Sequence, residues 1–322
     1  MKVFTVKNYG TPVDALQIEE CQIPKPGKDE ITIAVKATTI NDYDWAMITG
    51  KPFIYRLMFG LLKPKNAIPG MELSGIVTSI GDEVGAFSVG DKVYGDISDH
   101  GFGTYAEYVC INANAVQKMP EQMDFVQATA LPHASLLAFQ AFEKVGLSKG
   151  QRVLINGAGG GVGTIGLQLA KLKECHVTGV DSEMKLEKMA SLGFDDVLDY
   201  RKIDFTNMDD QYDVILDCKS TRSISSLTKV LNPTGKYITV GGSIGKLLHL
   251  AVWGKLANWI TGKHFGILAL KPNRELHRIA ALFQQQKLTA CIDGPHSFDT
   301  IPNLVNYFGK GNHFGKVVII LD

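Results

Sequence analysis

The chain has 322 residues, 45% of them hydrophobic, so it is long enough for two domains with sizeable cores. Lysine and arginine number 33, as do aspartate and glutamate, and this balance argues against a nucleic-acid binder that works through bulk charge. The five cysteines form no CxxC pair, so they suggest neither a disulfide framework nor a zinc ribbon and favour a cytoplasmic location.

Short apolar runs separated by Gly and Pro fill the chain from residue 1 to about residue 119. Such runs are typical of an all-β unit. Its strands are expected at residues 30–37, 75–81, 90–96 and 104–111, with one helix at 42–49. The next segment, residues 51–65, is rich in bulky apolar side chains and either covers a substrate cleft or packs on the β unit.

From about residue 151 strands and helices alternate, which predicts a parallel sheet with both faces covered and therefore an α/β fold. Strands are expected at residues 152–156, 176–180, 196–200, 212–218, 236–242 and 265–270, with a turn at 232–235. Helices are expected up to residue 172, at 183–192 and up to 231. In the tail, residues 275–286 predict a helix and 315–322 a strand.

The most apolar long segment is residues 247–270. Histidines and lysines interrupt it, so no run approaches the roughly 18 uncharged apolar residues of a membrane span. It predicts a buried or interfacial helix followed by a strand, and no membrane partner is expected.

A glycine-rich turn, INGAGGGVGTIG, begins at Ile155. The pattern GxxGxxG follows Asn156 directly, where a strand ends and a helix begins. Glycine lets another group approach the backbone, and a helix N-terminus offers N–H groups and a positive dipole end to a pyrophosphate. The turn therefore predicts a dinucleotide site, with a ligand-free tight turn as the alternative. The assigned residues are Gly157, Gly160, Gly161, Val162 and Gly163.

Polar residues follow the second strand of this α/β region. An acidic residue about 20 positions past the glycines, here Asp181, normally receives ribose hydroxyls and favours NAD. Ser182 and Lys185 are placed to hold a 2'-phosphate and favour NADP instead. The alternative for Lys185 is a solvated lysine on the helix surface.

Together these segments resemble the zinc-less quinone oxidoreductase branch of the medium-chain dehydrogenase/reductase superfamily. The resemblance rests on INDYDW at 40–45, GMELSGIV at 70–77, VGDKVYG at 89–95, GTYAEYV at 103–109, the glycine turn and GKVVIIL at 315–321. It implies a GroES-like (chaperonin-10-like) catalytic β domain over residues 1–119, a Rossmann domain with a doubly wound parallel sheet over 120–270, and a C-terminal return to the catalytic domain over 271–322. It also implies a cleft between the domains for nicotinamide and substrate, and a homodimer.

In the NADPH-using members of this branch, a Lys after the second strand and a Tyr fifteen residues later flank the 2'-phosphate. Lys185 and Tyr200 have this spacing, so the resemblance implies NADPH, with NADH possible because of Asp181. Gly241 and Gly242, which end the strand expected at 236–242, are assigned to the same nucleotide site.

The zinc-dependent relatives have Cys where this chain has Asn41 and His where it has Met71. No cysteine lies between Cys110 and Cys175 to supply another ligand, and the structural-zinc cysteine cluster is missing. Catalytic zinc needs about three His, Cys or carboxylate ligands. The sequence therefore predicts no zinc site of either kind.

Without zinc, ordinary alcohol oxidation loses its route to an alkoxide, whereas quinones and α,β-unsaturated carbonyls are already electrophilic. An NADPH-dependent reductase of such acceptors is therefore expected. Asn41 is the leading polar contact, with a helix N-cap as its alternative role. Tyr43 is a candidate donor to the acceptor or else a packed aromatic residue, and Asp44 is expected to fix the local turn.

Two other functions are kept open. The first is an NAD(P)-binding structural or regulatory protein without turnover, because no catalytic acid is evident. The second, more remote, is a serine hydrolase, because residues 241–245 match GxSxG around Ser243. A nucleophile of that kind requires an acidic residue and then a histidine downstream.

Overall fold

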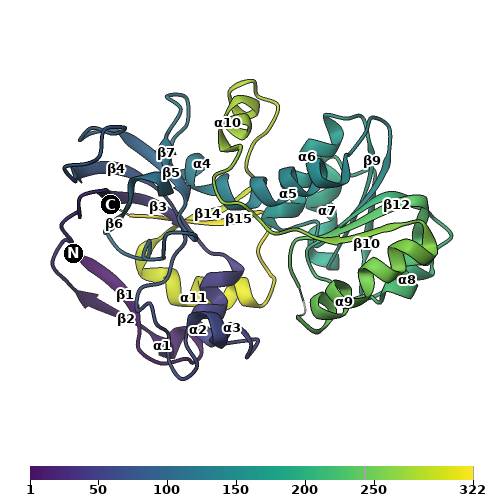
Figure 1. Ribbon diagram of the computed structural model, residues 1–322, viewed down its shortest axis with the longest axis horizontal. Helices are drawn as coiled ribbons and strands as arrows, with labels where there is room; N and C mark the ends of the chain where they lie inside the picture. The colour runs from purple at the N-terminus through teal and green to yellow at the C-terminus, as the bar shows by residue number, and fades with distance from the viewer. Residues whose placement is uncertain (243, 322) are drawn as a thin grey trace. The chain divides into compact units, whose positions relative to one another are not determined.

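The computed structural model describes residues 1–242 and 244–321, and the chain divides into two compact units (Figure 1). Unit 1 comprises Met1–His133, Pro272–Ala280 and Ile292–Asp322, and unit 2 comprises Ala134–Lys271 and Ala281–Cys291. The domain limits expected at residues 119 and 270 stay predictions. Ser243, the hydrolase candidate, lies outside the described residues.

Unit 1 is built mainly from short strands, as its Gly- and Pro-punctuated sequence predicts. Its strands are β1 (Lys2–Val6), β2 (Leu16–Glu20), β3 (Glu30–Thr39), β4 (Glu72–Ile80), β5 (Lys92–Asp96), β6 (Tyr108–Asn112), β7 (Gln117–Lys118), β14 (Ile292–Ser297) and β15 (Lys316–Ile320). Its helices are α1 (Pro12–Ala15), α2 (Asp42–Thr49), α3 (Tyr55–Phe59), α4 (Phe125–Ala130) and α11 (Ile301–Gly309), with short 3-10 turns at Ala113–Ala115 and Phe298–Thr300.

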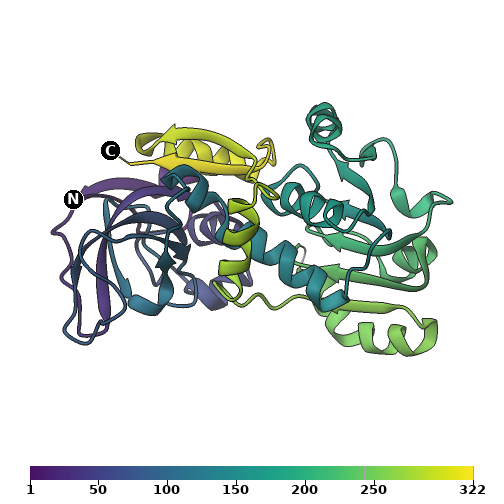
Figure 2. The same ribbon diagram turned by 90° about the horizontal axis from the view of Figure 1, so that it is seen from above.

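Seven of these strands form one sheet, in which the order is β14-β15-β3-β4-β5-β7 and β6 also pairs with β3. The C-terminal strand β15 therefore lies beside β3, antiparallel to it, with Val318 opposite Thr39. Figure 2 shows β14 and β15, in yellow, side by side. Buried Val, Ile and Leu side chains from β1, β3, β4 and β15 form a common core. The pairing of β15 with β3 thus brings residues from the two ends of the chain together in one sheet.

The apolar segment 51–65 packs on unit 1 mainly through one residue. Phe59, at the end of α3, is buried and its ring contacts Phe102 and Tyr43. Most of the other large apolar side chains are exposed, namely Phe53, Ile54, Leu57, Met58, Leu61 and Leu62.

Unit 2 is an α/β unit whose elements follow the predicted alternation. Its strands are β8 (Arg152–Asn156), β9 (His176–Asp181), β10 (Asp196–Asp199), β11 (Tyr212–Asp217), β12 (Leu231–Thr239) and β13 (His264–Ile267). Its helices are α6 (Gly161–Lys171), α7 (Glu183–Leu192), α8 (Ile224–Val230) and α9 (Ile244–Thr261), with a 3-10 turn at Phe205–Asn207. Two helices span both units in sequence, α5 (Pro132–Val145) and α10 (Leu276–Gln284).

All six strands of unit 2 are parallel, in the order β10-β9-β8-β11-β12-β13. The chain runs outward from β8 to β10 on one side and from β11 to β13 on the other. The order therefore reverses between β8 and β11, and open α/β sheets bind ligands at the carboxyl ends of strands at such a point. The glycine turn follows β8 at this position.

The turn expected at residues 232–235 is wrong as a strand boundary. These residues lie inside β12, where the pairing with β11 jumps from Leu231 to Lys236. The segment NPTG does turn, because a Cβ at Gly235 would lie 2.9 Å from the main-chain oxygen of Asn232, but pairing with β11 is present on both sides of it. In the described part of the chain, no helix has the length and apolar character needed to cross a bilayer.

Candidate active site

The glycine turn connects β8 to α6 and is held in a conformation that side chains would oppose. Gly157 has φ +88°, a left-handed conformation that favours glycine. A Cβ at Gly163 would lie 2.4 Å from the carbonyl oxygen of Ala158, so only glycine lets the first turn of α6 pack on the loop. The loop is tied to β9 because Gly157 and Ala158 donate their N–H groups to the Val180 carbonyl.

The N-terminus of α6 can hold an anionic group. Gly160 is the N-cap residue, and the helix begins at Gly161. The N–H groups of Gly161, Val162 and Gly163 lie in the first turn, where no intrahelical acceptor exists. Main-chain donors of this kind, together with the helix dipole, bind phosphate groups. The turn therefore fits the diphosphate of a dinucleotide.

Gly241 and Gly242 follow β12 after a single residue, Val240. Gly242 has φ +117°, and a Cβ there would lie 2.3 Å from the carbonyl oxygen of Lys219, which follows β11. The sheet order reverses between β8 and β11, and the two glycines lie just after the end of β12, the neighbour of β11. This position agrees with a place along the nucleotide site, whereas their contact with a cofactor stays a prediction.

Asp181 and Lys185 pair with each other beside the glycine turn. Lys185 Nζ lies 3.4 Å from Asp181 Oδ1, and the two side chains are only 6% and 10% exposed. Asp181 Oδ2 accepts a hydrogen bond from the Gly159 N–H at 2.9 Å, and Oδ1 accepts one from the Ser182 N–H at 2.8 Å. Lys185 is therefore not the solvated helix lysine of the alternative interpretation. The two residues with opposite cofactor preferences form one charge-compensated pair.

Tyr200 lies next to this pair in the sheet. It follows β10, and its N–H donates to the carbonyl oxygen of Asp181 at 3.2 Å. Its ring is half exposed, and the guanidinium of Arg201 lies over it, 5.6 Å from the centroid. Guanidinium groups bind phosphates well, so Arg201 is a further cation at the predicted 2'-phosphate position that motif spacing did not identify.

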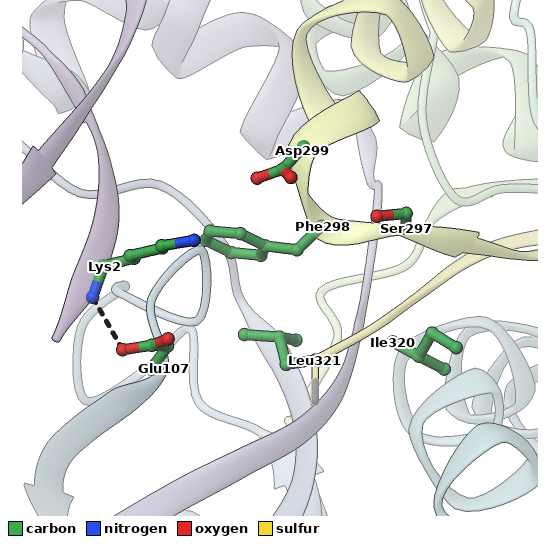
Figure 3. A pocket seen from close by; sticks show the side chains of 7 residues that line it. All are labelled: Lys2, Glu107, Ser297, Phe298, Asp299, Ile320 and Leu321. Atoms are coloured by element: carbon green, nitrogen blue, oxygen red, sulfur yellow. Dashed lines mark hydrogen bonds between the residues drawn. The ribbon is translucent and has the colours of Figure 1, made fainter.

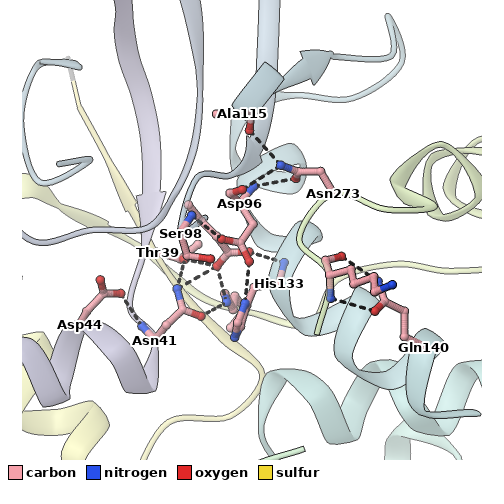
Figure 4. Close-up of polar contacts among 12 residues, drawn as sticks. Thr39, Asn41, Asp44, Asp96, Ser98, Ala115, His133, Gln140 and Asn273 are labelled. Atoms are coloured by element: carbon pink, nitrogen blue, oxygen red, sulfur yellow. Dashed lines mark hydrogen bonds and ion pairs between the residues drawn. The ribbon is translucent and has the colours of Figure 1, made fainter. Parts of the chain in front are cut away.

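In unit 1, a buried carboxylate at the start of β4 organises a polar network. Figure 4 shows three members of this network, Thr39, Asn41 and His133. Glu72 is fully buried. Its Oε2 atom contacts the Lys316 ammonium at 2.5 Å and accepts hydrogen bonds from Thr39 and Asn41. Its Oε1 atom accepts from the main-chain N–H of His133 at 2.6 Å. The network thus joins β3, β4, β15 and the start of α5.

Asn41 serves both as the first residue before α2 and as a member of this network. Asp44 accepts a hydrogen bond from the Asn41 N–H at 2.9 Å and another from the Gly70 N–H, so it fixes the local turn as expected. The Asn41 amide nitrogen donates to Glu72, and its oxygen accepts from the Lys316 ammonium. Because both ends of the amide have partners inside the protein, a direct contact with substrate or ribose stays a prediction.

His133 and Asp96 form a second ionisable pair beside the network. His133 Nδ1 lies 2.7 Å from Asp96 Oδ2 at the end of β5. Burial alone would lower the pKa of His133, but the Asp96 carboxylate outweighs it and the pKa lies above the ordinary histidine value. Burial likewise opposes ionisation of Asp96, yet His133 and the hydrogen bonds from Ser98 hold the pKa of this carboxyl low. The side chain of His133 is 17% exposed, so a protonated imidazole is accessible.

Tyr43 lies in an aromatic cluster with Tyr55, Phe59 and His133 (ring centroids 6.1, 6.1 and 6.3 Å from its own). Burial, together with nearby carboxylates led by Asp96, raises the pKa of its phenol. Tyr43 is therefore protonated at neutral pH and able to donate. The geometry agrees with both interpretations of Tyr43, a packed aromatic residue and a donor to the acceptor. The ring is packed in the cluster, and the hydroxyl keeps the proton that it would donate.

The position of a catalytic zinc in the relatives is filled differently here. Asn41 and Glu72 both contact the ammonium of Lys316, and Met71, at the position of a histidine ligand, is fully buried. Within residues 1–242 and 244–321, no group of three or more His, Cys, Asp or Glu side chains is arranged to hold a metal ion. An amide, a thioether and a carboxylate already paired with an ammonium make a poor donor set for zinc.

Three members of the unit 1 network were not identified from the sequence: Asp96, His133 and Lys316. Asp96 ends the strand expected at 90–96, Lys316 lies in the motif GKVVIIL, and His133 lies in no motif named above. Single polar residues of this kind are a weak signal, since capping and solvation explain most of them. A separate pocket of unit 1, whose lining includes Lys2, Glu107 and Asp299, contains none of the predicted site residues (Figure 3).

Known proteins of similar sequence and structure cover the whole chain. The alcohol dehydrogenase GroES-like domain matches residues 27–121, and the zinc-binding dehydrogenase family matches residues 192–319. A 2-methylene-furan-3-one reductase of Solanum lycopersicum is 30% identical over 330 residues, which are 99% of this chain and 79% of that protein. A chloroplastic NADPH-dependent alkenal/one oxidoreductase of Arabidopsis thaliana is 27% identical, with the same coverage.

The quinone oxidoreductase of Coxiella burnetii has a similar solved structure. The TM-score is 0.87 at 27% identity, and the match covers 100% of this chain and 99% of that one. The chain therefore belongs to the medium-chain dehydrogenase/reductase superfamily. Within it, the chain belongs with the quinone and enone oxidoreductases, so the family and the α/β fold with a GroES-like domain predicted from the sequence are confirmed.

Proposed function

We propose that the protein is an NADPH-dependent reductase of quinones or α,β-unsaturated carbonyls that needs no zinc. Two observations carry this proposal: a dinucleotide-type glycine turn in unit 2, and a polar network in unit 1 that contains the pairs Glu72–Lys316 and Asp96–His133. The named activities of the tomato and Arabidopsis relatives support the same class of acceptor.

In this proposal, unit 2 binds the cofactor. The first-turn N–H groups of α6 hold the diphosphate, and Lys185, Tyr200 and Arg201 surround the 2'-phosphate. Binding of the phosphate requires Lys185 to exchange part of its interaction with Asp181 for the new anion. Asp181 could instead receive the ribose hydroxyls of NADH, so the preference depends on the balance within one ion pair.

Unit 1 supplies the groups for the acceptor. Reduced nicotinamide, when bound, would supply a hydride to the conjugated acceptor, whose carbonyl oxygen would take up the displaced electron pair. Tyr43 donates a hydrogen bond to that oxygen, which stabilises the developing negative charge. The imidazolium of His133 then gives one proton to complete the reduction, and Asp96 stabilises the charged imidazole before transfer.

The donor set at the family's zinc position supports the proposal of a zinc-independent reaction. The Lys316 ammonium already neutralises Glu72, and a conjugated acceptor spreads its developing charge over several atoms. Positioning and hydrogen bonds can therefore replace a Lewis acid.

A spectrophotometric assay tests the proposal. The purified full chain is mixed with NADPH or NADH and with a panel of quinones, enones, aldehydes and alcohols, with and without a chelator. Oxidation of NADPH by quinones or enones that persists with the chelator is expected. Turnover restricted to alcohols with added zinc would refute the proposal. Cofactor binding without turnover on any acceptor would favour the structural or regulatory alternative.

Replacing Lys185 with Met should shift the cofactor preference. A hydrogen bond to a charged group contributes roughly 1.5–3 kcal/mol, so the Kd for NADPH should rise about 10- to 100-fold. The Kd for NADH should change little or fall, because Asp181 is released to bind ribose hydroxyls. Fluorescence titration of both cofactors measures the ratio, which separates phosphate recognition from general damage to the fold.

Lys188→Met is the matched control, because Lys188 lies on the same helix and is exposed. It should leave both dissociation constants unchanged. An equal loss of NADPH and NADH affinity in Lys185→Met would assign Lys185 a purely structural role.

We also propose a cytoplasmic location and a homodimer. All five cysteines are free, which suits a reducing compartment. Light scattering coupled to size-exclusion chromatography measures the assembly directly, and fractionation of the source cells measures the location.

A further inference from the structure

One long stretch of unit 2 carries charge of a single sign. Residues 218–271 contain seven lysines and one arginine but no aspartate or glutamate, in a chain whose basic and acidic residues number 33 each. The stretch includes α8, β12, α9 and β13. Its local positive charge therefore does not follow from the overall composition.

The helix α9 exposes large apolar side chains to solvent. The sequence predicts a buried or interfacial helix followed by a strand for the apolar segment 247–270. This segment forms most of α9 and the strand β13, and only part of the surface of α9 is covered by the rest of the protein. The exposed fractions are 57% for Leu248, 66% for Val252, 52% for Trp253, 83% for Trp259 and 66% for Ile260. Leu250 and Gly254 are the buried residues of the helix, so the opposite face packs on unit 2.

The exposed residues of α9 form one stripe with lysines at its edges. With 3.6 residues per turn, Leu248, Val252, Trp253, Leu256, Trp259 and Ile260 fall within a sector of about 140°. Lys255 lies just beyond one edge of this sector and Lys246 just beyond the other. Long lysine side chains at such edges can place their ammonium groups above an apolar phase in which the stripe is buried.

The neighbouring helix α8 extends this surface. A shallow groove of apolar and small polar side chains lies between α8 and α9, lined by Ile224, Thr228, His249, Trp253, Leu256 and Ile260. None of the groove residues is acidic. Figure 1 shows the two helices side by side in unit 2. We call these α8 and α9 residues, with Lys246 and Lys255, the α9 surface.

We propose that the α9 surface docks unit 2 on an anionic lipid membrane, with α9 lying in the plane of the interface. A helix with an exposed apolar stripe, tryptophans and flanking lysines but no acidic residue is suited to the headgroup region of a bilayer. Lys246 and Lys255 are exposed and, among the described residues, no carboxylate pairs with either of them, so their charge can complement anionic lipids. Docking of this kind needs no spanning helix and does not depend on the proposed reaction.

A second copy of the chain fits this surface less well. In a two-fold symmetric dimer the same patch would face itself, so lysine side chains would meet others of the same sign. The α9 surface offers no carboxylate to pair with them. A lipid surface supplies the negative charge that the protein lacks at this position.

The full chain can be tested by co-sedimentation with vesicles. Neutral phosphatidylcholine vesicles are compared with vesicles containing about one-third phosphatidylglycerol, at low and high salt. Binding to the anionic vesicles is expected to be stronger and to weaken with salt. Two of the three tryptophans, Trp253 and Trp259, lie on the α9 surface, so vesicle binding should also shift the fluorescence emission to the blue.

Two double variants separate charge from apolar contact. Lys246→Gln with Lys255→Gln should lower the partition coefficient roughly 25-fold, since each lysine contributes about fivefold at an anionic surface. Trp253→Ser with Trp259→Ser should abolish binding. Lys173→Gln with Lys287→Gln, two exposed lysines of unit 2 outside the basic stretch, is the control and should bind like the natural chain. Unchanged NADPH affinity shows that each variant is folded.

Three results would overturn the proposal: no binding to anionic vesicles, binding unaffected by the α9 variants, or equal binding to neutral vesicles. Binding that is lost only when Leu57 and Leu62 are replaced would move the membrane contact to the apolar segment 51–65. Loss of dimers in the tryptophan variant, without any vesicle binding by the natural chain, would assign the α9 surface to a second copy.

Discussion

Replacing Lys316 with Met is expected to lower the free energy of unfolding by about 3–5 kcal/mol. Glu72 is fully buried, and the Lys316 side chain is only 7% exposed, so the carboxylate would stay in the interior without its cation. Thr39 and Asn41 would continue to donate hydrogen bonds to it, but neither carries charge. Urea unfolding followed by circular dichroism measures the effect.

Lys28→Met is the matched control for this prediction. Lys28 also pairs with a glutamate, Glu83, but these side chains are 78% and 62% exposed, and a pair of that kind contributes at most about 1 kcal/mol. The double variant Glu72→Gln with Lys316→Met should recover part of the lost stability, because no unpaired charge remains buried. Equal effects of Lys316→Met and Lys28→Met would contradict the assigned role of Glu72 and Lys316.

Replacing His133 with Asn should lower kcat for enone reduction by about 10²- to 10⁴-fold, the usual contribution of a general acid. The main-chain N–H of residue 133 would continue to donate to Glu72, so the fold should survive. Cofactor affinity should stay unchanged. Steady-state kinetics over a range of pH, combined with cofactor titration, checks all three expectations.

The pH dependence gives His133 a signature that a structural role would lack. A general acid acts in its protonated form, so the rate of the natural enzyme should fall as pH rises through the raised pKa of His133. Asp96→Asn removes the carboxylate that raises this pKa and should move the fall to lower pH. His100→Asn, at an exposed histidine of unit 1, should change nothing. Persistence of the pH limb in His133→Asn would rule out the histidine as its source.

The α/β unit could be predicted well from the sequence because its signals are local. The glycine turn, the helix at residues 183–192 and the strands before and after it depend on neighbours within about 20 residues, and the structure has them at these positions. The segment NPTG shows the limit of such reasoning. Its turn chemistry is real, but strand pairing across β11 carries the chain through it.

The polar network of unit 1 could not be predicted because its partners are distant in sequence. Asn41 and Lys316 are 275 positions apart and meet only because β15 returns to pair with β3. His133 and Asp96 similarly meet only after β5 and the start of α5 are placed. Family resemblance identified Asn41 and Tyr43 as candidates, whereas the ion pairs around them could be identified only from the three-dimensional structure.

The burial of Lys185 and the exposure of α9 are two further features that are hard to predict from a single sequence. Residue type favours a solvated lysine, but Asp181, four positions earlier, gives Lys185 a buried partner across the glycine turn. Hydrophobicity favours burial of the apolar helix, but the number of apolar residues in α9 exceeds what one contact face can cover. In both cases the packing partner decides the outcome.

The return of β15 to β3 has a consequence for the order in which the chain folds during synthesis. All of unit 2 has been translated before residue 292 leaves the ribosome, so it can reach its final form first. The long sheet of unit 1 has an unfilled place between β3 and β14 until the last strand is released. Until then Glu72 has no cation to pair with, and a ribosome stalled near residue 310 would carry a complete unit 2 and an incomplete sheet in unit 1.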